Sequence, residues 1–158
     1  MSIRQRWHKF RTLPHSRRAI LVEASFWLVV ARLLIMVLPF RWIARRIGRL
    51  RQPEALPLDH TRGSAVPRDS PDVAHSVSWA IDRAARVLPM QLVCLPRALA
   101  AWQMLRRRGI HAQVHFGASR AAGRDALMSH AWVDADGVEV TGYPEAHNCV
   151  EIGFFAQS

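Results

Sequence analysis

The spacing of the apolar residues changes at Gly109, and this change constrains the fold more than any other feature of the sequence. From Leu95 to Leu105 the apolar residues recur every three or four positions, which predicts a helix with one buried face. From Ile110 to Phe116 they alternate with polar residues, which predicts a strand. Asp136-Gly137, which separates two further apolar runs, indicates a hairpin turn. Helices followed by an antiparallel sheet make the predicted fold class α+β.

The other elements follow from the same patterns and from helix start and stop signals. Ser16 can cap a first helix that Pro39 ends, and Ser70-Pro71-Asp72 has the cap, proline and acid of a helix start. The predicted helices span residues 17–38, 40–50, 70–87 and 94–109, and the predicted strands span residues 110–116, 127–134, 138–141 and 149–155.

Residues 52–71 carry four prolines among many turn-forming residues, which is typical of a linker. We therefore predict an N-terminal helical region over residues 1–51, a linker over residues 52–71 and a main domain over residues 72–158.

The net charge of +10 comes entirely from the N-terminal third of the chain. Residues 1–51 hold 12 Lys+Arg and one acid, a balance of +11, whereas residues 52–158 hold 10 Lys+Arg and 11 acids, a balance of −1. Such a region suits an acidic protein partner, an anionic membrane surface, or a solvated face around an apolar helix. No zinc-finger spacing or interleaved aromatic pattern is present, so no nucleic-acid partner is expected.

The apolar stretch from Ala19 to Phe40 is long enough to cross a bilayer, which requires about 20 apolar residues. Glu23 and Arg32 interrupt it, and charges within a span are costly. We therefore favour a helix that is buried against the rest of the protein, or one that lies on a membrane or a partner. Residues 1–51 are expected to make a peripheral membrane contact or to dock a partner.

Cys94 and Cys149 lie 55 residues apart, and the basic start of the chain has no small-residue cleavage site after its apolar stretch. These features predict a cytoplasmic protein with free thiols. His111 and His115 share a strand face but lack a third ligand in register, so no metal site is predicted, and no cofactor is expected.

Cys94 is predicted to begin the 94–109 helix, with Pro96 in its first turn. Unpaired backbone N–H groups and the positive end of the helix dipole favour the thiolate there, which is the nucleophilic form. With His130 on a later strand, Cys94 completes the minimal pair of a Cys-His hydrolase or acyltransferase. The alternative is a small buried cysteine and a histidine whose hydrogen bonds are satisfied in the core.

The motif Cys94-Leu95-Pro96-Arg97, followed by a helix, a strand and then His130-Ala131-Trp132-Val133, resembles the stand-alone leader peptidases of lasso-peptide biosynthesis. These are transglutaminase-like cysteine peptidases, and the same domain forms the C-terminal part of the microcin J25 processing protein. The resemblance covers residues 72–155. It implies a papain/transglutaminase-like core in which the nucleophile's helix packs on an antiparallel sheet, with Cys94 as nucleophile and His130 as general base and acid.

The resemblance also implies a substrate and partners. The substrate would be a ribosomally made precursor peptide, cut between its leader and its core. A separate ATP-dependent lasso cyclase would then close the ring, and a small leader-binding protein, the recognition element, would deliver the precursor.

The family's triad has an Asp twelve residues after the His, and Gly142 occupies that position here. A three-residue loop over residues 135–137 would pair His130 with residue 142, where an orienting carboxylate would lie about 5 Å away. Glycine has no side chain to play that part. The alternatives are Thr141 or Tyr143 after a one-residue slip in register, Glu145 or Asn148 from the following loop, a backbone carbonyl, or water.

Three further residues near the motifs have two interpretations each. Gln91 either adds a side-chain donor for the oxyanion or lies on the surface. Trp132 shares His130's strand face and either walls the cleft or packs in the core. Arg97 either binds substrate or pairs with a buried acid.

The leading hypothesis is a cysteine peptidase that removes a leader peptide. The same Cys94 and His130 also suit a transglutaminase-like acyltransferase. The non-enzymatic alternative is a scaffold or membrane-associated module of the same biosynthetic complex, with the basic N-terminal third responsible for binding.

Overall fold

The computed structural model describes residues 14–52, 70–120 and 127–156. Its helices are α2 (His15–Val37), α3 (Phe40–Ile47), α4 (Ser70–Ala85), α5 (Cys94–Arg106) and a short 3-10 helix, η2 (Glu145–Asn148). Its strands are β1 (Arg49–Arg51), β2 (Ala112–Arg120), β3 (Leu127–Ala135), β4 (Val138–Thr141) and β5 (Val150–Ala156).

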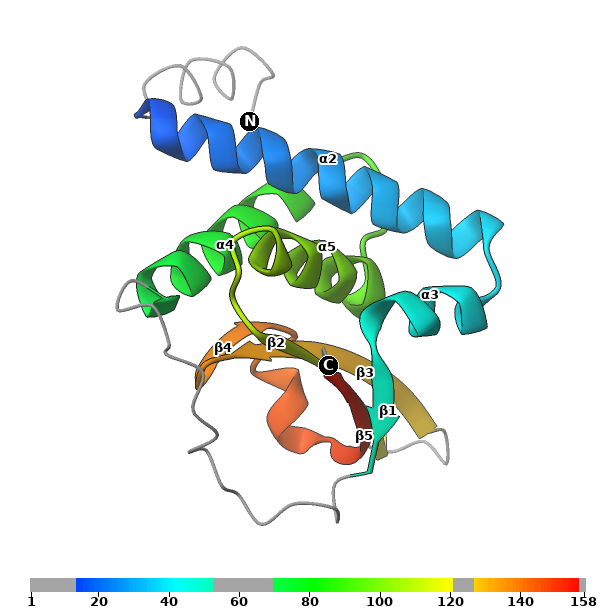
Figure 1. Ribbon diagram of the computed structural model, residues 1–158. Helices are drawn as coiled ribbons and strands as arrows, with labels where there is room; N and C mark the ends of the chain where they lie inside the picture. Colours follow the sequence, from blue (N-terminus) through cyan, green and yellow to red (C-terminus); the bar gives the residue numbers. More distant parts are fainter. Residues whose placement is uncertain (1–13, 53–69, 121–126, 157–158) are drawn as a thin grey trace.

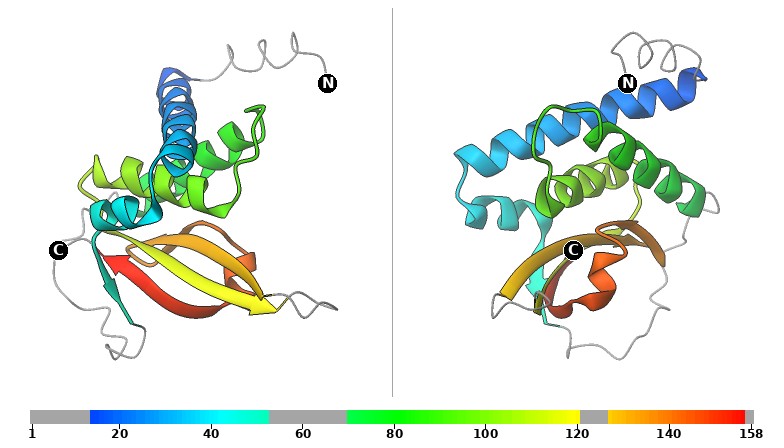
Figure 2. Two further views of the ribbon diagram at one scale, coloured as in Figure 1. Left: turned by 90° about the vertical axis from the view of Figure 1, so that its right-hand side faces the viewer. Right: turned by 180° about the vertical axis from the view of Figure 1, so that it is seen from behind.

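The elements are stacked in layers, as Figures 1 and 2 show. The long helix α2 lies across α4 and α5, and these two helices cover one face of the sheet. The short helix η2 lies against the other face, next to β3. The strand order is β1-β5-β2-β3-β4, and all four described pairs are antiparallel.

One hydrophobic core lies between the helices and the sheet. From α2 it takes Leu21, Ala24, Leu28 and Ala31, which the helical repeat places on one face. Fully burying a side chain such as that of Leu28 contributes about 1.5–3 kcal/mol to stability. The sheet and α5 supply the rest of this core from alternate strand residues and from most of the helix surface.

The predicted α+β class is confirmed, and each predicted helix and strand has a counterpart in the structure. The predicted cap at Ser16 is wrong, because α2 begins at His15 and Pro14 is its N-cap residue, with no side-chain cap hydrogen bond. The helix predicted over residues 40–50 is too long. It ends at Ile47 because Gly48, at a φ of 144°, adopts a conformation suited to glycine, and Arg49–Arg51 then pair with β5. Most of the predicted linker lies outside the described residues.

The β3–β4 hairpin turns through two residues, so the predicted three-residue loop is wrong. Ala135 pairs with Val138, and the two turn residues, Asp136 and Gly137, have φ values of 48° and 81°. Two consecutive positive φ values are the mark of a type I′ turn, whose twist matches that of the flanking strands.

A bulge between Val133 and Asp134 then shifts the pairing of β3 with β4. Val133 pairs with Thr141, so the same register places Gly142 beside Trp132 and not beside His130.

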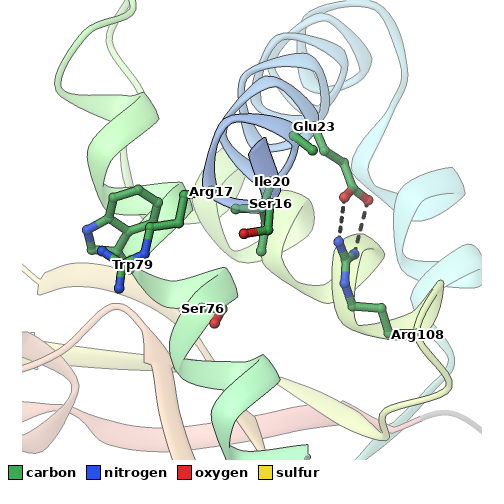
Figure 3. Close-up of a pocket in the computed structure, with 8 residues that line it drawn as sticks. Ser16, Arg17, Ile20, Glu23, Ser76, Trp79 and Arg108 are labelled. Atoms are coloured by element: carbon green, nitrogen blue, oxygen red, sulfur yellow. Dashed lines mark hydrogen bonds and ion pairs between the residues drawn. The ribbon is translucent and has the colours of Figure 1, made fainter. Parts of the chain in front are cut away.

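Glu23 lies within the apolar stretch and ties α2 to the end of α5. Arg108 donates from Nη1 to Glu23 Oε1 at 3.1 Å and from Nη2 to Oε2 at 2.5 Å, as Figure 3 shows. Hydrogen bonds from Arg108 hold the pKa of the Glu23 carboxyl below its usual range, against the opposing effect of burial. These two residues also line a cavity of about 380 Å³ between α2, α4 and α5, together with Trp79 and Ser76. The acid that interrupts the apolar stretch therefore has a partner inside the protein.

We expect Arg108→Gln to lower the free energy of unfolding by about 1 kcal/mol at pH 7, because it removes this ion pair. The pKa of Glu23 is lower in the folded chain than in the unfolded chain. The ion pair therefore contributes its full free energy of stabilisation above the unfolded pKa, and this contribution is lost as the pH falls through the folded pKa. Urea unfolding should therefore show the deficit at pH 7 and a much smaller one near pH 3. Arg86→Gln, at an exposed arginine of α4's C-terminal turn, is the matched control. An equal deficit in both variants would contradict the role of the pair.

Candidate active site

Cys94 is the first residue of α5, so the predicted helix start is confirmed. Val93 before it is extended, with φ −69° and ψ −174°, and no side chain caps the helix. The first backbone N–H groups of α5 therefore have no side-chain partner. The Cys94 thiol is free and partly buried, and it packs against the core. Such N–H groups can hold an oxyanion.

His130 lies on β3, and its imidazole is oriented by a backbone carbonyl. The ring's Nε2 is 2.7 Å from the carbonyl oxygen of Gly142. Because a carbonyl oxygen can only accept, Nε2 carries the hydrogen, and Nδ1 of the neutral ring holds the lone pair. Nδ1 is therefore the nitrogen that can take a proton from a thiol.

Cys94 and His130 start from opposite sides of β3. Ala131 and Val133 belong to the core on the helix side, and successive strand residues point to opposite faces. His130 and Trp132 therefore point to the other face, whereas Cys94 packs on the helix side. Within the described part of the chain, no hydrogen bond joins the Cys94 thiol to the His130 ring. The structure orients the predicted base, and among the described residues it shows no hydrogen bond from that base to the predicted nucleophile.

Gly142 is required by the backbone. Its φ is +91°, and a Cβ added there would lie 2.6 Å from Trp132 Cβ and 2.9 Å from the carbonyl oxygen of Ala131. An aspartate cannot occupy this position unless β3 moves. The expectation that glycine contributes nothing here is corrected, because the Gly142 carbonyl holds His130 at the position where the resembled family has its carboxylate.

Trp132 packs on the same strand face as His130, as predicted. The two rings are stacked with centroids 6.2 Å apart, and Trp132 also stacks on His115 of β2 at 5.4 Å. Gly117 makes room for the indole, since a Cβ there would lie 2.9 Å from two of its ring carbons. Trp132 is buried, so it walls His130 on one side as part of a small cluster beneath the sheet.

A polar network beside this cluster was not predicted from the sequence. His115 is buried, its Nδ1 is 2.7 Å from Glu151 Oε1, and its Nε2 is 3.4 Å from Asp134 Oδ2. Tyr143 donates its hydroxyl hydrogen to Asp134. Burial raises the pKa of the Asp134 carboxyl, while burial and the neighbouring carboxylate raise that of Tyr143. The sequence signal that could have revealed this network is Glu151, the one charged residue in the last apolar strand.

The remaining predicted residues lie apart from the His130 ring. Asn148 and Glu145 are exposed on η2, and neither side chain has a hydrogen bond to His130 among the described residues. Gln91 is exposed just before α5. Arg97 forms an ion pair with Asp82 of α4. The predicted partner was a buried acid, whereas the Asp82 side chain is 44 % exposed, so the pairing is present but the predicted burial is wrong.

The part of the chain that the structure describes holds no group of three or more His, Cys, Asp or Glu side chains placed to bind a metal ion.

We expect Gly142→Ala to lower the free energy of unfolding by about 2–5 kcal/mol. About 1–2 kcal/mol comes from the positive φ, and overpacking against Trp132 adds about 1–3 kcal/mol. Gly137→Ala is the matched control, because Gly137 has a φ of +81° but nothing within 4 Å of an added Cβ, so only the first contribution applies. Gly142→Asp, which restores the family's residue type, should lose at least as much as Gly142→Ala. Equal losses at Gly142 and Gly137 in urea unfolding would contradict the close contact with β3.

A known protein family shares the elements that carry Cys94 and His130. The family model of the transglutaminase-like superfamily matches residues 34–151, from the end of α2 to the start of β5. Searches among curated proteins and solved structures returned no significant match. The family model covers well over half of the chain, including α5 with Cys94 and β3 with His130. The chain therefore belongs to the transglutaminase-like superfamily.

Proposed function

We propose that this protein is a cysteine peptidase that removes the leader from a ribosomally made lasso-peptide precursor. The superfamily supports thiol-dependent peptidase or acyl-transfer chemistry. The observation that carries the proposal is the hydrogen bond from His130 Nε2 to the Gly142 carbonyl. This bond leaves the lone pair of Nδ1 free to accept a proton. The same chain is a superfamily member and has a cysteine at the start of a helix. The choice of a lasso-peptide precursor rests on the resemblance of Cys94–Arg97 and His130–Val133 to those leader peptidases.

The proposed reaction uses groups of this chain alone. Cys94 Sγ attacks the scissile carbonyl carbon, and the thiol proton passes to His130 Nδ1. His130 then gives that proton to the leaving amine as the peptide C–N bond breaks, which leaves an acyl-thioester on Cys94. Water attacks the thioester, a proton returns to the thiol through His130, and the carboxylate product departs. Each backbone N–H group at the start of α5 that holds the oxyanion contributes about 3 kcal/mol in the transition state.

The dyad must close before this reaction can begin, since no hydrogen bond joins Cys94 to His130 in the described residues. We assign closure to the binding of the precursor together with its delivery protein. Among the described residues, β3 pairs with β4 only at Val133, Asp134 and Ala135. The segment that carries His130 therefore has no described strand partner on that edge and is freer to rearrange. This assignment agrees with the proposed need for a leader-binding recognition element. The ring-closing cyclase would act afterwards on the released core, and the free thiols suit a cytoplasmic reaction.

A second candidate is a non-catalytic module of the same complex. The lack of a hydrogen bond between Cys94 and His130 among the described residues favours it, as does the absence of an orienting carboxylate at residue 142. A third outcome, acyl transfer to an amine, uses the same acyl-enzyme and differs only in the acceptor.

We expect Cys94→Ala and His130→Ala each to reduce leader removal by at least a hundredfold when the chain is combined with a lasso-peptide precursor and its leader-binding protein, because each removes a reacting group. Cys149→Ala is the matched control. Cys149 is the other free thiol and donates to the Glu145 carbonyl at 3.5 Å, so cleavage should be unchanged. Mass spectrometry of the products separates a carboxylate from an amide formed with an added amine. Unchanged cleavage by Cys94→Ala would support the scaffold instead.

Alkylation by iodoacetamide tests closure separately. In the isolated chain at pH 7 we expect His130→Ala to leave the alkylation rate of Cys94 nearly unchanged, because no hydrogen bond joins the two side chains among the described residues. With precursor and leader-binding protein present, the rate in the unchanged chain should rise several-fold over that of His130→Ala. Peptide mass spectrometry follows both thiols, with Cys149 as the internal reference. A rate that is insensitive to His130 under both conditions would contradict the dyad.

A further inference from the structure

The helix α2 carries a second apolar face, turned away from the protein. Its side chains are those of Val22, Phe26, Leu33, Met36 and Val37, and they are 58, 58, 54, 67 and 77 % exposed. Helical geometry aligns these positions along one side of α2, and none of them is charged. We call these five residues the outer face of α2. Soluble proteins rarely leave a contiguous apolar strip of this length uncovered.

A second exposed apolar surface lies on α3, which follows α2 in the chain. Phe40 and Trp42 are 45 and 56 % exposed, and Trp42 shares a groove of about 390 Å³ with Leu34 and Leu38 of the preceding segment. This groove runs between α2, α3 and α5, and most of its lining is apolar. Arg46 also lines it, so cationic and apolar groups meet at the same surface.

The charge around this surface has one sign. Residues 14–52 contain eight arginines and a single acid, Glu23, which is paired with Arg108. On α3 the exposed positions beside Trp42 are Arg41, Arg45 and Arg46. The surface therefore combines a long apolar strip, an exposed tryptophan and arginines that form no ion pair among the described residues.

We propose that the outer face of α2 and the exposed side of α3 lie on an anionic lipid surface. The apolar side chains would enter the boundary between headgroups and acyl chains, Trp42 would sit at the headgroup level, and the arginines would contact lipid phosphates. Lipid suits this surface better than a protein does, because an acyl layer needs no matching shape and the phosphates supply the negative charge along the whole arginine row.

The helix lies in the plane of the membrane surface and does not cross the bilayer. By length and composition α2 could span a membrane. Leu21, Leu28 and Ala31 belong to the core, and Glu23 is held by Arg108. A spanning helix would have to leave that core and carry Glu23 into hydrocarbon, which is costly. This proposal does not depend on peptidase activity.

Vesicle sedimentation with the full chain tests the proposal. The chain should bind vesicles that contain about one-third phosphatidylglycerol in phosphatidylcholine, more tightly than vesicles of phosphatidylcholine alone. The double variant Phe26→Ser/Met36→Ser should weaken binding to both kinds of vesicle at least tenfold. Its matched control is the double variant Val87→Ser/Ile152→Ser, which changes two similarly exposed residues elsewhere. Circular dichroism checks that each variant is folded.

A second pair of variants tests the charge. Each arginine near an anionic surface is worth about fivefold in binding, so Arg41→Gln/Arg45→Gln/Arg46→Gln should remove most of the preference for phosphatidylglycerol. Arg83→Gln/Arg86→Gln/Arg120→Gln changes three exposed arginines outside the surface and should keep that preference. Binding should also fall in 0.5 M salt.

Three results would overturn the proposal. The first is a folded chain that binds neither vesicle. The second is a dimer that Phe26→Ser/Met36→Ser converts to a monomer, because the outer face would then join two copies. The third is bound chain that resists extraction at pH 11 and is protease-protected on both sides of α2, because the helix would then span the bilayer.

Discussion

Burial of α5 from two sides is the constraint on which the rest of the structure depends. Eight of its 13 residues are buried, because α2 and α4 pack on one side and β2 and β3 on the other. Ala98, Ala100 and Ala101 are small enough to let these neighbours approach closely. A helix in this middle position needs a complete layer on each side, so the apolar inner face of α2 is required for the main domain to have a core. The start of α5 then fixes where the Cys94 thiol lies.

The sequence predicted most of the fold because hydrophobic spacing is strong wherever one face of an element is buried. It failed where an element buries little. All three residues of β1 are exposed, so no alternation marks it, and β1 joins the sheet only through its pairing with β5. The division at residues 52–71 followed composition, whereas α2 and β1 pack on elements that come after this stretch. Contacts between distant segments leave no local signal in a single sequence.

For the candidate site, side-chain patterns located Cys94 and His130 but could not supply the geometry between them. The orienting group of His130 is a backbone carbonyl, and every residue has one, so no residue type marks it. The bulge between Val133 and Asp134 moved Gly142 by one position, and hairpin arithmetic alone does not include bulges. Ala131 and Val133 are buried against the helices, so alternation along β3 turns His130 to the other face of the sheet. The His130–Val133 motif does not specify which of its residues are buried.

The two faces of α2 place different demands on the same helix. Folding accounts for the inner face, where Leu21, Leu28 and Ala31 complete the core above α5. It does not account for the outer face, because polar residues there would fold as well and would be more soluble. The ion pair from Glu23 to Arg108 adds a polar contact between α2 and the end of α5. A helix that is held in place by its inner face and is apolar on its outer face presents a fixed surface to the outside.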